Sequence, residues 1–200
     1  MMIRTMVNLV LLFGGKMLSA EDAKDRVLFS FEEKNAAQQW QAVNDGVMGG
    51  RSDGRLRITD NKTMEFIGTL SLENNGGFAS VRTRASALDL KKNDLLVARV
   101  RGDGREYAFN LYTPSRSTAF SYRAPFQTKK DEWVEVELPL DKFIATSFGQ
   151  VVQNQPLAAD SITGLGILLG DKKAGTFKLE IEWIKVRTSQ PAALQPLKVR

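Results

Sequence analysis

Short segments that alternate apolar and polar residues fill this chain almost without interruption from residue 27 to residue 186. Alternation with a period of two is typical of strands that bury one face. Residues 176–186 illustrate it, with apolar positions at Phe177, Leu179, Ile181 and Trp183. Turn-forming residues separate the segments, which are 27–31, 54–59, 62–70, 77–83, 95–101, 105–113, 119–125, 132–138, 163–169 and 176–186. This pattern predicts an all-β fold, a single β-sandwich of the jelly-roll type.

Helical patterns are scarce, and only residues 33–39 and 140–143 could form a turn. Residues 145–161 contain no strand pattern and are predicted to be a long irregular connection. The chain shows no internal repeat, so we expect one domain over residues 21–187. The remaining residues, 188–200, are rich in Pro, Gln and Ala, and we expect a disordered tail there.

The N-terminus supports two interpretations. Arg4 precedes a short apolar stretch at residues 7–15, and small residues end at Ala20, which is the order found in a signal peptide cleaved after Ala20. Alternatively, Met17 is the true start and the residues before it are a misassigned extension. We therefore expect the protein to be either exported or cytoplasmic. The apolar stretch is too short for a transmembrane helix.

The composition excludes several classes of function. The 200 residues include no cysteine and no histidine, which excludes Ser-His and Cys-His nucleophilic pairs and zinc sites built from these ligands. No pair of carboxylates shows the arrangement of a glycosidase. We therefore expect that the protein is not an enzyme, and we expect it to bind neither a metal ion nor a cofactor. The net charge of +5 comes from scattered basic residues, which do not form the stripe typical of a nucleic-acid interface.

A glycine-rich segment, N-D-G-V-M-G-G-R-S at residues 44–52, is the first candidate binding site. Glycine permits backbone conformations closed to other residues, so such a loop can direct N–H groups at an anion or a partner. The alternative is structural: a tight corner whose Val-Met pair fills the core and whose polar side chains satisfy loop amides. The candidate site residues are Asp45, Gly49, Gly50 and Ser52.

A polar sheet face is the second candidate. If Leu96, Ala98 and Val100 face the core, the residues between them point outward. A hairpin loop at residues 102–104 is then expected to pair this strand with residues 105–113, and the next strand adds one arginine. The residues expected side by side on this outer face are Arg99, Arg101, Asn110, Tyr112 and Arg123. Arginine and tyrosine are enriched where proteins bind partners, although an ordinary solvated face would have the same pattern.

Several motifs, in a fixed order, resemble a known family. They are D-G-V-M-G-G-R-S at 45–52, F-I-G-T-L-S-L at 66–72, G-G-F-A-S-V-R at 76–82 and the closing strands at 164–184. In this order they resemble the family of complex I intermediate-associated protein 30 (CIA30), and the resemblance covers roughly residues 27–186, most of the chain. The resemblance implies a galactose-binding-like jelly roll, the architecture of many carbohydrate-binding modules.

The resemblance also implies a function. A CIA30-like chain is expected to be a non-catalytic interaction module, an assembly factor or chaperone whose protein client is an intermediate of respiratory complex I. The alternative is a carbohydrate- or small-ligand-binding module, by analogy with other galactose-binding-like folds. An exposed tryptophan over a polar groove would favour that alternative, whereas we expect Trp40, Trp133 and Trp183 in the core or at its rim.

Overall fold

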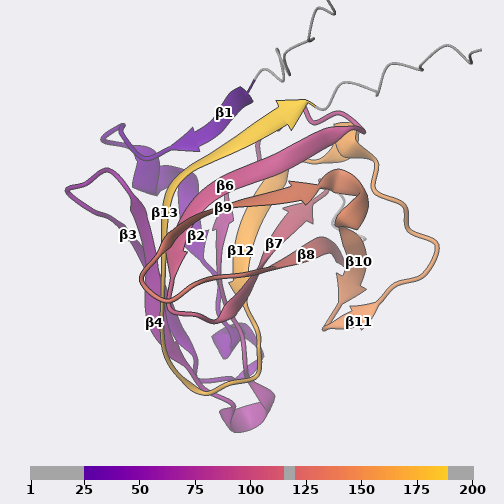
Figure 1. Ribbon diagram of the computed structural model, residues 1–200. Coiled ribbons are helices and arrows are strands. Elements are labelled where there is room, and N and C mark those ends of the chain that lie inside the picture. Colours follow the sequence, from indigo (N-terminus) through magenta and orange to yellow (C-terminus); the bar gives the residue numbers. More distant parts are fainter. Residues whose placement is uncertain (1–24, 115–119, 189–200) are drawn as a thin grey trace, which may run out of the picture.

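The computed structural model describes residues 25–114 and 120–188, which form a sandwich of two β-sheets (Figure 1). The all-β sandwich predicted from the sequence is confirmed. The expected signal peptide or misassigned start at residues 1–20 lies outside the described residues. So do residues 189–200 of the expected tail.

Each sheet draws strands from the whole length of the chain. In spatial order, sheet A contains β3 (Asp53–Ile58), β4 (Met64–Leu70), β13 (Gly175–Thr188), β6 (Asp94–Gly102) and β9 (Trp133–Pro139), with β1 (Asp25–Ser30) also paired to β13. Sheet B contains β11 (Gln150–Val151), β10 (Ile144–Ser147), β8 (Ser121–Gln127), β7 (Glu106–Tyr112), β12 (Gly164–Leu169), β5 (Ala79–Thr83) and β2 (Trp40–Ala42). The helical turns are η1 (Ala36–Gln39), η2 (Asp45–Met48), η3 (Glu73–Asn75), η4 (Leu140–Lys142) and η5 (Ala159–Ser161).

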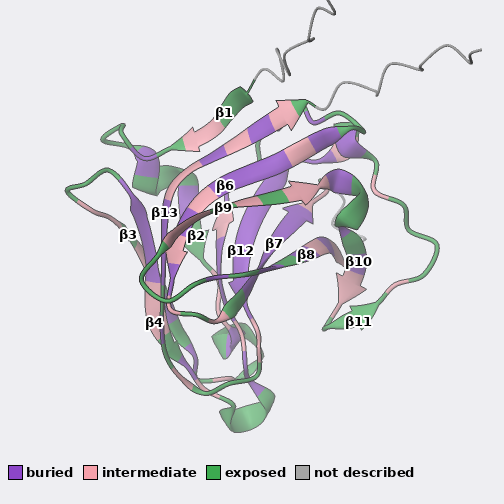
Figure 2. Cartoon of the chain, in the orientation of Figure 1, coloured by how far each residue is buried: buried purple, intermediate pink, exposed green. Residues whose placement is uncertain are grey.

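The core lies between the two sheets, and alternation decides which side chains enter it. On β6 the inward residues are Leu96, Ala98 and Val100, and on β7 they are Tyr107, Phe109 and Leu111. Figure 2 shows β12 buried along its length, as expected of a strand inside a sheet. Burying a large apolar side chain stabilises a fold by about 1.5–3 kcal/mol, so this inner layer holds the sheets together.

The turn at Gly102 joins the two sheets instead of closing a hairpin, which corrects the sequence-based pairing. β6 pairs with β13 and β9 in sheet A, whereas β7 pairs with β8 and β12 in sheet B. Gly102 passes so close to the loop after β8 that a Cβ there would lie 2.4 Å from the Cβ of Thr128. The N–H of Asp131 donates to the carbonyl of Gly102 at 2.9 Å. These contacts turn the chain out of sheet A.

Residues 145–161, expected to be irregular, contain a small hairpin. β10 pairs with β8 at the edge of sheet B, and β11 pairs with β10. Phe148 and Gly149 form the turn with φ values of 46° and 81°. A turn with two left-handed residues matches the twist of paired strands, so this short hairpin forms despite its weak strand pattern.

A bulge in β13 corrects the expected placement of Trp183. The register shifts between Ile181 and Trp183, so one residue, Glu182, is left without a partner on β6. The core positions then continue at Ile184 and Val186, and Trp183 moves to the outer face, where the Nζ of Lys185 lies 4.0 Å from its ring centroid.

Candidate functional site

Asp45, the first residue of η2, is fully buried, and its carboxylate accepts hydrogen bonds from both glycine-rich segments. Ser52 donates from its backbone N–H to Oδ1 at 2.9 Å and from its hydroxyl to Oδ2 at 2.6 Å. The backbone N–H groups of Gly77 and Phe78 donate to Oδ2 at 2.6 and 3.2 Å. Burial alone would raise the pKa of Asp45, but these hydrogen bonds outweigh it and hold the pKa below its ordinary range.

The position of this carboxylate explains why both segments are rich in glycine. Residues 43–52 carry the chain from β2 in sheet B to β3 in sheet A, and residues 71–78 carry it back from β4 to β5. A Cβ on Gly50 would lie 2.4 Å from the Cγ of Asp45, and one on Gly76 would lie 2.6 Å from its Oδ2. Asp45 therefore joins the two crossings, and glycine makes room for it.

Gly49 has a φ of 89°, which favours glycine, and it ends η2. The structural interpretation of this loop placed Val47 and Met48 in the core, and that detail is wrong. Their exposed fractions are 74% and 51%. Because η2 is a single turn whose inward position is taken by Asp45, the next two side chains point into solvent. The four candidate residues of this loop thus form a corner between the two sheets. The carboxylate of Asp45 already accepts hydrogen bonds from within the protein.

Arg99 and Arg101 lie on the outer face of sheet A, where acidic neighbours bind both. Nη2 of Arg101 lies 2.6 Å from Oε2 of Glu180, and Nε of Arg99 lies 2.7 Å from Oε2 of Glu182. Both guanidinium groups also lie over the ring of Trp133, at 5.6 Å for Arg99 and 4.9 Å for Arg101. The charge of each guanidinium group is therefore bound by a carboxylate of sheet A, and its planar face is covered by an aromatic ring of the same sheet.

The sequence placed these two arginines beside Asn110 and Tyr112, and the topology shows that this is wrong. Each residue does face outward on its own strand. However, β6 and β7 belong to different sheets, so Arg101 and Tyr112 lie on opposite outer faces of the sandwich. A glycine-rich loop between two strand patterns looks the same in sequence whether the strands pair or change sheet.

The outer face of sheet B carries the other predicted residues: Asn110 and Arg123 lie in one row across six strands, and Tyr112 lies beside that row, opposite Gly164. The register pairs Asn110 with Arg123 on one side and with Gly166 on the other. Arg82 follows opposite Gly166, and Ile144 follows opposite Arg123. From β2 to β10, this sheet B row consists of Gln41, Arg82, Gly166, Asn110, Arg123 and Ile144.

Hydrogen bonds and a ring contact connect three polar members of the row to two neighbours on the same face of sheet B. Nε of Arg123 donates to Oδ1 of Asn110 at 3.2 Å, and Nδ2 of Asn110 donates to the hydroxyl of Tyr112 at 3.3 Å. Cζ of Arg82 lies 5.2 Å from the centroid of the Tyr112 ring, and its Nε donates to the hydroxyl of Ser80 at 3.2 Å. Asn110 and Ser80 are buried, so they form a polar floor beneath the two guanidinium groups.

Tyr112 lies against the part of β12 whose outward positions, Gly164 and Gly166, have no side chains. A Cβ on Gly166 would lie 3.0 Å from Cε2 and from the hydroxyl of Tyr112, and one on Gly164 would lie 3.5 Å from its Cβ. The two glycines of β12 thus leave room for the ring to lie across the sheet. This packing fixes the ring between Arg82 and Asn110.

The sheet B row has two positive charges, and no described residue supplies a counter-charge. Among the described residues, no ion pair involves Arg82 or Arg123. Burial lowers the pKa of Arg123, and the nearby charge of Arg82 lowers it further. Arginine stays protonated at neutral pH despite such a shift. Two like charges are therefore held near each other, over two buried polar side chains that bind their Nε groups.

Arg82 and Ser80 were not among the candidate residues of the sequence analysis. They belong to the G-G-F-A-S-V-R segment, in which Ala79 and Val81 enter the core and the residues between them face outward. The alternation of this short strand was the available signal, because it places a hydroxyl and a guanidinium on the same face. The strands that lie next to Ser80 and Arg82 on this face depend on the order of strands in the sheet, which alternation does not reveal.

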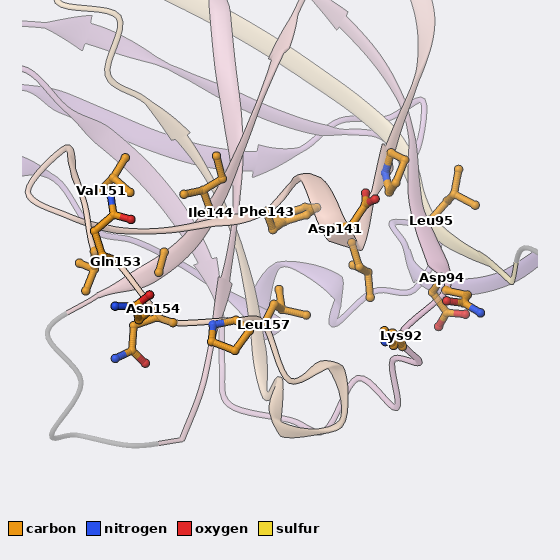
Figure 3. Close-up of a pocket in the computed structure, with 17 residues that line it drawn as sticks. Lys92, Asp94, Leu95, Asp141, Phe143, Ile144, Val151, Gln153, Asn154 and Leu157 are labelled. Carbon is orange, nitrogen blue, oxygen red and sulfur yellow. The ribbon is translucent and has the colours of Figure 1, made fainter.

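A pocket of about 900 Å³ lies at the end of sheet B beside the β10–β11 hairpin. Figure 3 shows Phe143, Ile144 and Leu157 along it, with Asp94 at its far end. The carboxylate of Asp94 accepts from the N–H of Lys91 and the hydroxyl of Thr188. Apolar side chains such as Leu95, Phe143 and Leu157 form much of the pocket wall. Ile144, which is half exposed, links the pocket to the sheet B row.

The described residues contain no group of three or more acidic side chains that could hold a metal ion. No helix in the part of the chain that the structure describes is both long and apolar enough to cross a membrane.

The fold matches solved structures of carbohydrate-binding modules. The family 11 module of the cellulosomal cellulase Lic26A-Cel5E of Clostridium thermocellum superposes with a TM-score of 0.64 and 16% identity, covering 85% of this chain and 98% of that one. A family 11 module from the same organism, in complex with a β-1,3-1,4-mixed-linked tetrasaccharide, gives a TM-score of 0.63 and 16% identity, covering 82% and 96%. The sandwich is therefore of the galactose-binding-like type.

Sequence comparison gives a narrower relationship. The mitochondrial complex I intermediate-associated protein 30 of Mus musculus is 31% identical over 185 residues, which is 82% of this chain and 56% of that protein. The chain spans between half and two thirds of the length of the curated relatives it matches. The model of the family "Complex I intermediate-associated protein 30 (CIA30)" matches residues 29–181. This chain belongs to the CIA30 family.

Proposed function

We propose that this chain is a non-catalytic interaction module that binds a protein client through the outer face of sheet B. The client is an intermediate in the assembly of respiratory complex I or of a comparable multi-subunit complex. The family relationship supports the kind of client, because the relatives are named for association with complex I intermediates. The unpaired arginines of the sheet B row support the surface.

The residue types of this face suit protein recognition. Arginine and tyrosine contribute a large share of the binding energy at protein interfaces, especially near the centre of the contact. Arg82, Tyr112 and Arg123 occupy the middle of sheet B, and Ile144 adds an exposed apolar side chain at its edge. A rigid sheet holds these side chains in place, so binding requires little ordering of the free protein.

Carbohydrate binding is the alternative function. The fold shared with family 11 modules and the flat Tyr112 ring over the glycines of β12 favour it. Against it, the tryptophans do not reach sheet B's outer face: Trp40 is buried, and Trp133 lies on sheet A beneath two guanidinium groups. One tyrosine offers less stacking surface than sugar-binding faces usually have.

Affinity capture from the native host tests the proposal, with co-purifying proteins quantified by mass spectrometry. We expect the wild-type protein to retain subunits of an assembly intermediate and the Tyr112→Ala/Arg123→Gln variant to lose them. The Lys129→Gln variant is the control, because this side chain is 69% exposed and lies beyond the end of β8, outside the row. Retention of the same subunits by the double variant would contradict the proposed surface. Binding of a soluble mixed-linked β-glucan, abolished by Tyr112→Ala, would support the alternative instead.

A further inference from the structure

The two unpaired arginines of sheet B converge on one spot. Arg82 and Arg123 stand on strands separated by β12 and β7, so their backbones are about 14 Å apart at the usual strand spacing. Yet Arg82 contacts the ring of Tyr112, and Arg123 binds Asn110, which in turn binds the Tyr112 hydroxyl. Both side chains therefore lean toward the middle of the sheet, against the repulsion between their charges.

The donors at this spot are not used up by the described residues. Arg82 and Arg123 each make one side-chain hydrogen bond to them, and in both cases the donor is Nε. The Nη groups, which form the outer edge of each guanidinium, can therefore donate to a second acceptor. The Tyr112 hydroxyl accepts from Asn110, and none of the described residues accepts its own proton. Such a set of donors around a positive centre fits the two oxygens of a carboxylate.

We infer that Arg82, Tyr112 and Arg123 form an oxyanion-binding site that takes a carboxylate from an acidic segment of the protein client. This inference rests on the proposed function, since it names the chemistry that the client presents to the sheet B row. Charge complementarity argues for it: the row has two positive charges, no acidic partner among the described residues, and a polar floor of Asn110 and Ser80.

The open form of the site favours a peptide over a small free anion. The row runs across the sheet from Gln41, which is exposed, to Ile144, whose exposed fraction is 53%. An extended peptide lying along this row can place an acidic residue between the arginines and an apolar residue on Ile144. A free anion would gain only the central contacts, without those that a peptide makes along the rest of the row.

Fluorescence anisotropy with two labelled peptides tests the inference. One peptide alternates Asp or Glu with apolar residues, and the other has Asn or Gln at the same positions. At low salt, we expect the wild-type protein to bind the acidic peptide at least about tenfold more tightly than the neutral one, as expected for charge-assisted contacts. In the Arg82→Gln/Arg123→Gln variant, affinity for the acidic peptide should fall about tenfold or more. Circular dichroism checks that the variant is folded.

A charge-matched control separates the site from the overall charge. The Arg55→Gln/Lys129→Gln variant also removes two positive charges, from side chains that are 66% and 69% exposed and outside the row. It should bind the acidic peptide as the wild type does. Equal loss in this control, or equal binding of the neutral peptide by the wild type, would overturn the inference. Inorganic phosphate that competes as tightly as the peptide would overturn the assignment to a peptide carboxylate.

Failure of the oxyanion site can be distinguished from failure of the proposed function. If the Arg82→Gln/Arg123→Gln variant still captures the client from the host, the interaction function stands and the oxyanion site is refuted. If the wild type prefers the acidic peptide but captures no assembly intermediate, the oxyanion site stands and the proposed client is refuted.

Discussion

The two outer faces of the sandwich carry matching rows of residues that use their charges differently. On sheet A, the row across β3, β4, β13, β6 and β9 consists of Arg57, Glu65, Glu180, Arg101 and Trp133. Each arginine there has an acidic neighbour, since Arg57 binds Glu65 and Arg101 binds Glu180. On sheet B, Arg82 and Arg123 also stand two to a row, but among the described residues neither has an acidic partner.

The difference separates charges that stabilise the fold from charges that remain available for binding. Glu65 and Glu180 are almost fully buried beneath the cations that bind them, so the sheet A face is neutralised by its own side chains. The arginines of the sheet B row form no ion pair with any residue that the structure describes, so their positive charge is not neutralised there. Features that do not help the fold are expected where a protein binds something else.

The largest effect is expected on sheet A, from Glu180→Ala. This carboxylate accepts from the hydroxyl of Thr63 at 2.8 Å and from Nη2 of Arg101 at 2.6 Å. Its removal leaves the buried Thr63 hydroxyl with only the Thr59 hydroxyl as a partner and takes the carboxylate from Arg101, so the free energy of unfolding should fall by about 3 kcal/mol in urea titrations. Glu182→Ala is the control, because its side chain is 44% exposed and its ion pair should contribute less than about 1 kcal/mol. Equal losses would mean that burial of the ion pair does not matter.

A somewhat smaller effect is expected at the corner that joins the two sheets. Gly50→Ala places a Cβ 2.4 Å from the Cγ of Asp45, so it should displace that carboxylate and destabilise the protein by about 2 kcal/mol. Gly46→Ala is the matched control, since no atom lies within 4 Å of its added Cβ. Thermal unfolding of both variants compares them. A neutral Gly50→Ala would show that the corner tolerates movement of Asp45 and leave the loop open to a binding role.

Acid should weaken the sheet A face. Burial alone would raise the pKa of Glu65, but Arg57 and Lys178 hold it below its usual value of 4.5. A lowered folded-state pKa contributes stability that is present above the unfolded value and is lost as the pH falls through the folded value. Unfolding free energies should therefore decrease from about pH 4.5 downward, and less steeply in Glu65→Gln than in the wild type. Parallel curves for the two proteins would contradict this role of Glu65.

The sequence predicts the direction of side chains better than the neighbours they meet. Alternation correctly placed Val100 in the core and Arg101 outside, and likewise Phe109 and Asn110, because it depends only on the strand itself. It could not show that β6 and β7 belong to different sheets, since this depends on contacts of Gly102 with a distant loop.

The same limit applies to the candidate site. The approach of Arg123 to Asn110 follows from pairing of consecutive strands, and it could be expected from the sequence. Arg82 reaches the row only because β12, from the far end of the chain, lies between β5 and β7. The register shift that turns Trp183 outward involves one extra residue, which local alternation does not reveal.

The central claim is that the arginines of sheet A stabilise the fold and those of sheet B do not. Two charge-matched double variants test it directly by urea unfolding, Arg99→Gln/Arg101→Gln on sheet A and Arg82→Gln/Arg123→Gln on sheet B. We predict that the sheet A variant loses about 2 kcal/mol, because Glu180 keeps a buried charge without its cation. The sheet B variant should stay within about 0.5 kcal/mol of the wild type, since relief of the repulsion between two like charges offsets the loss of the hydrogen bonds to Ser80 and Asn110. A loss on sheet B as large as that on sheet A would contradict the account.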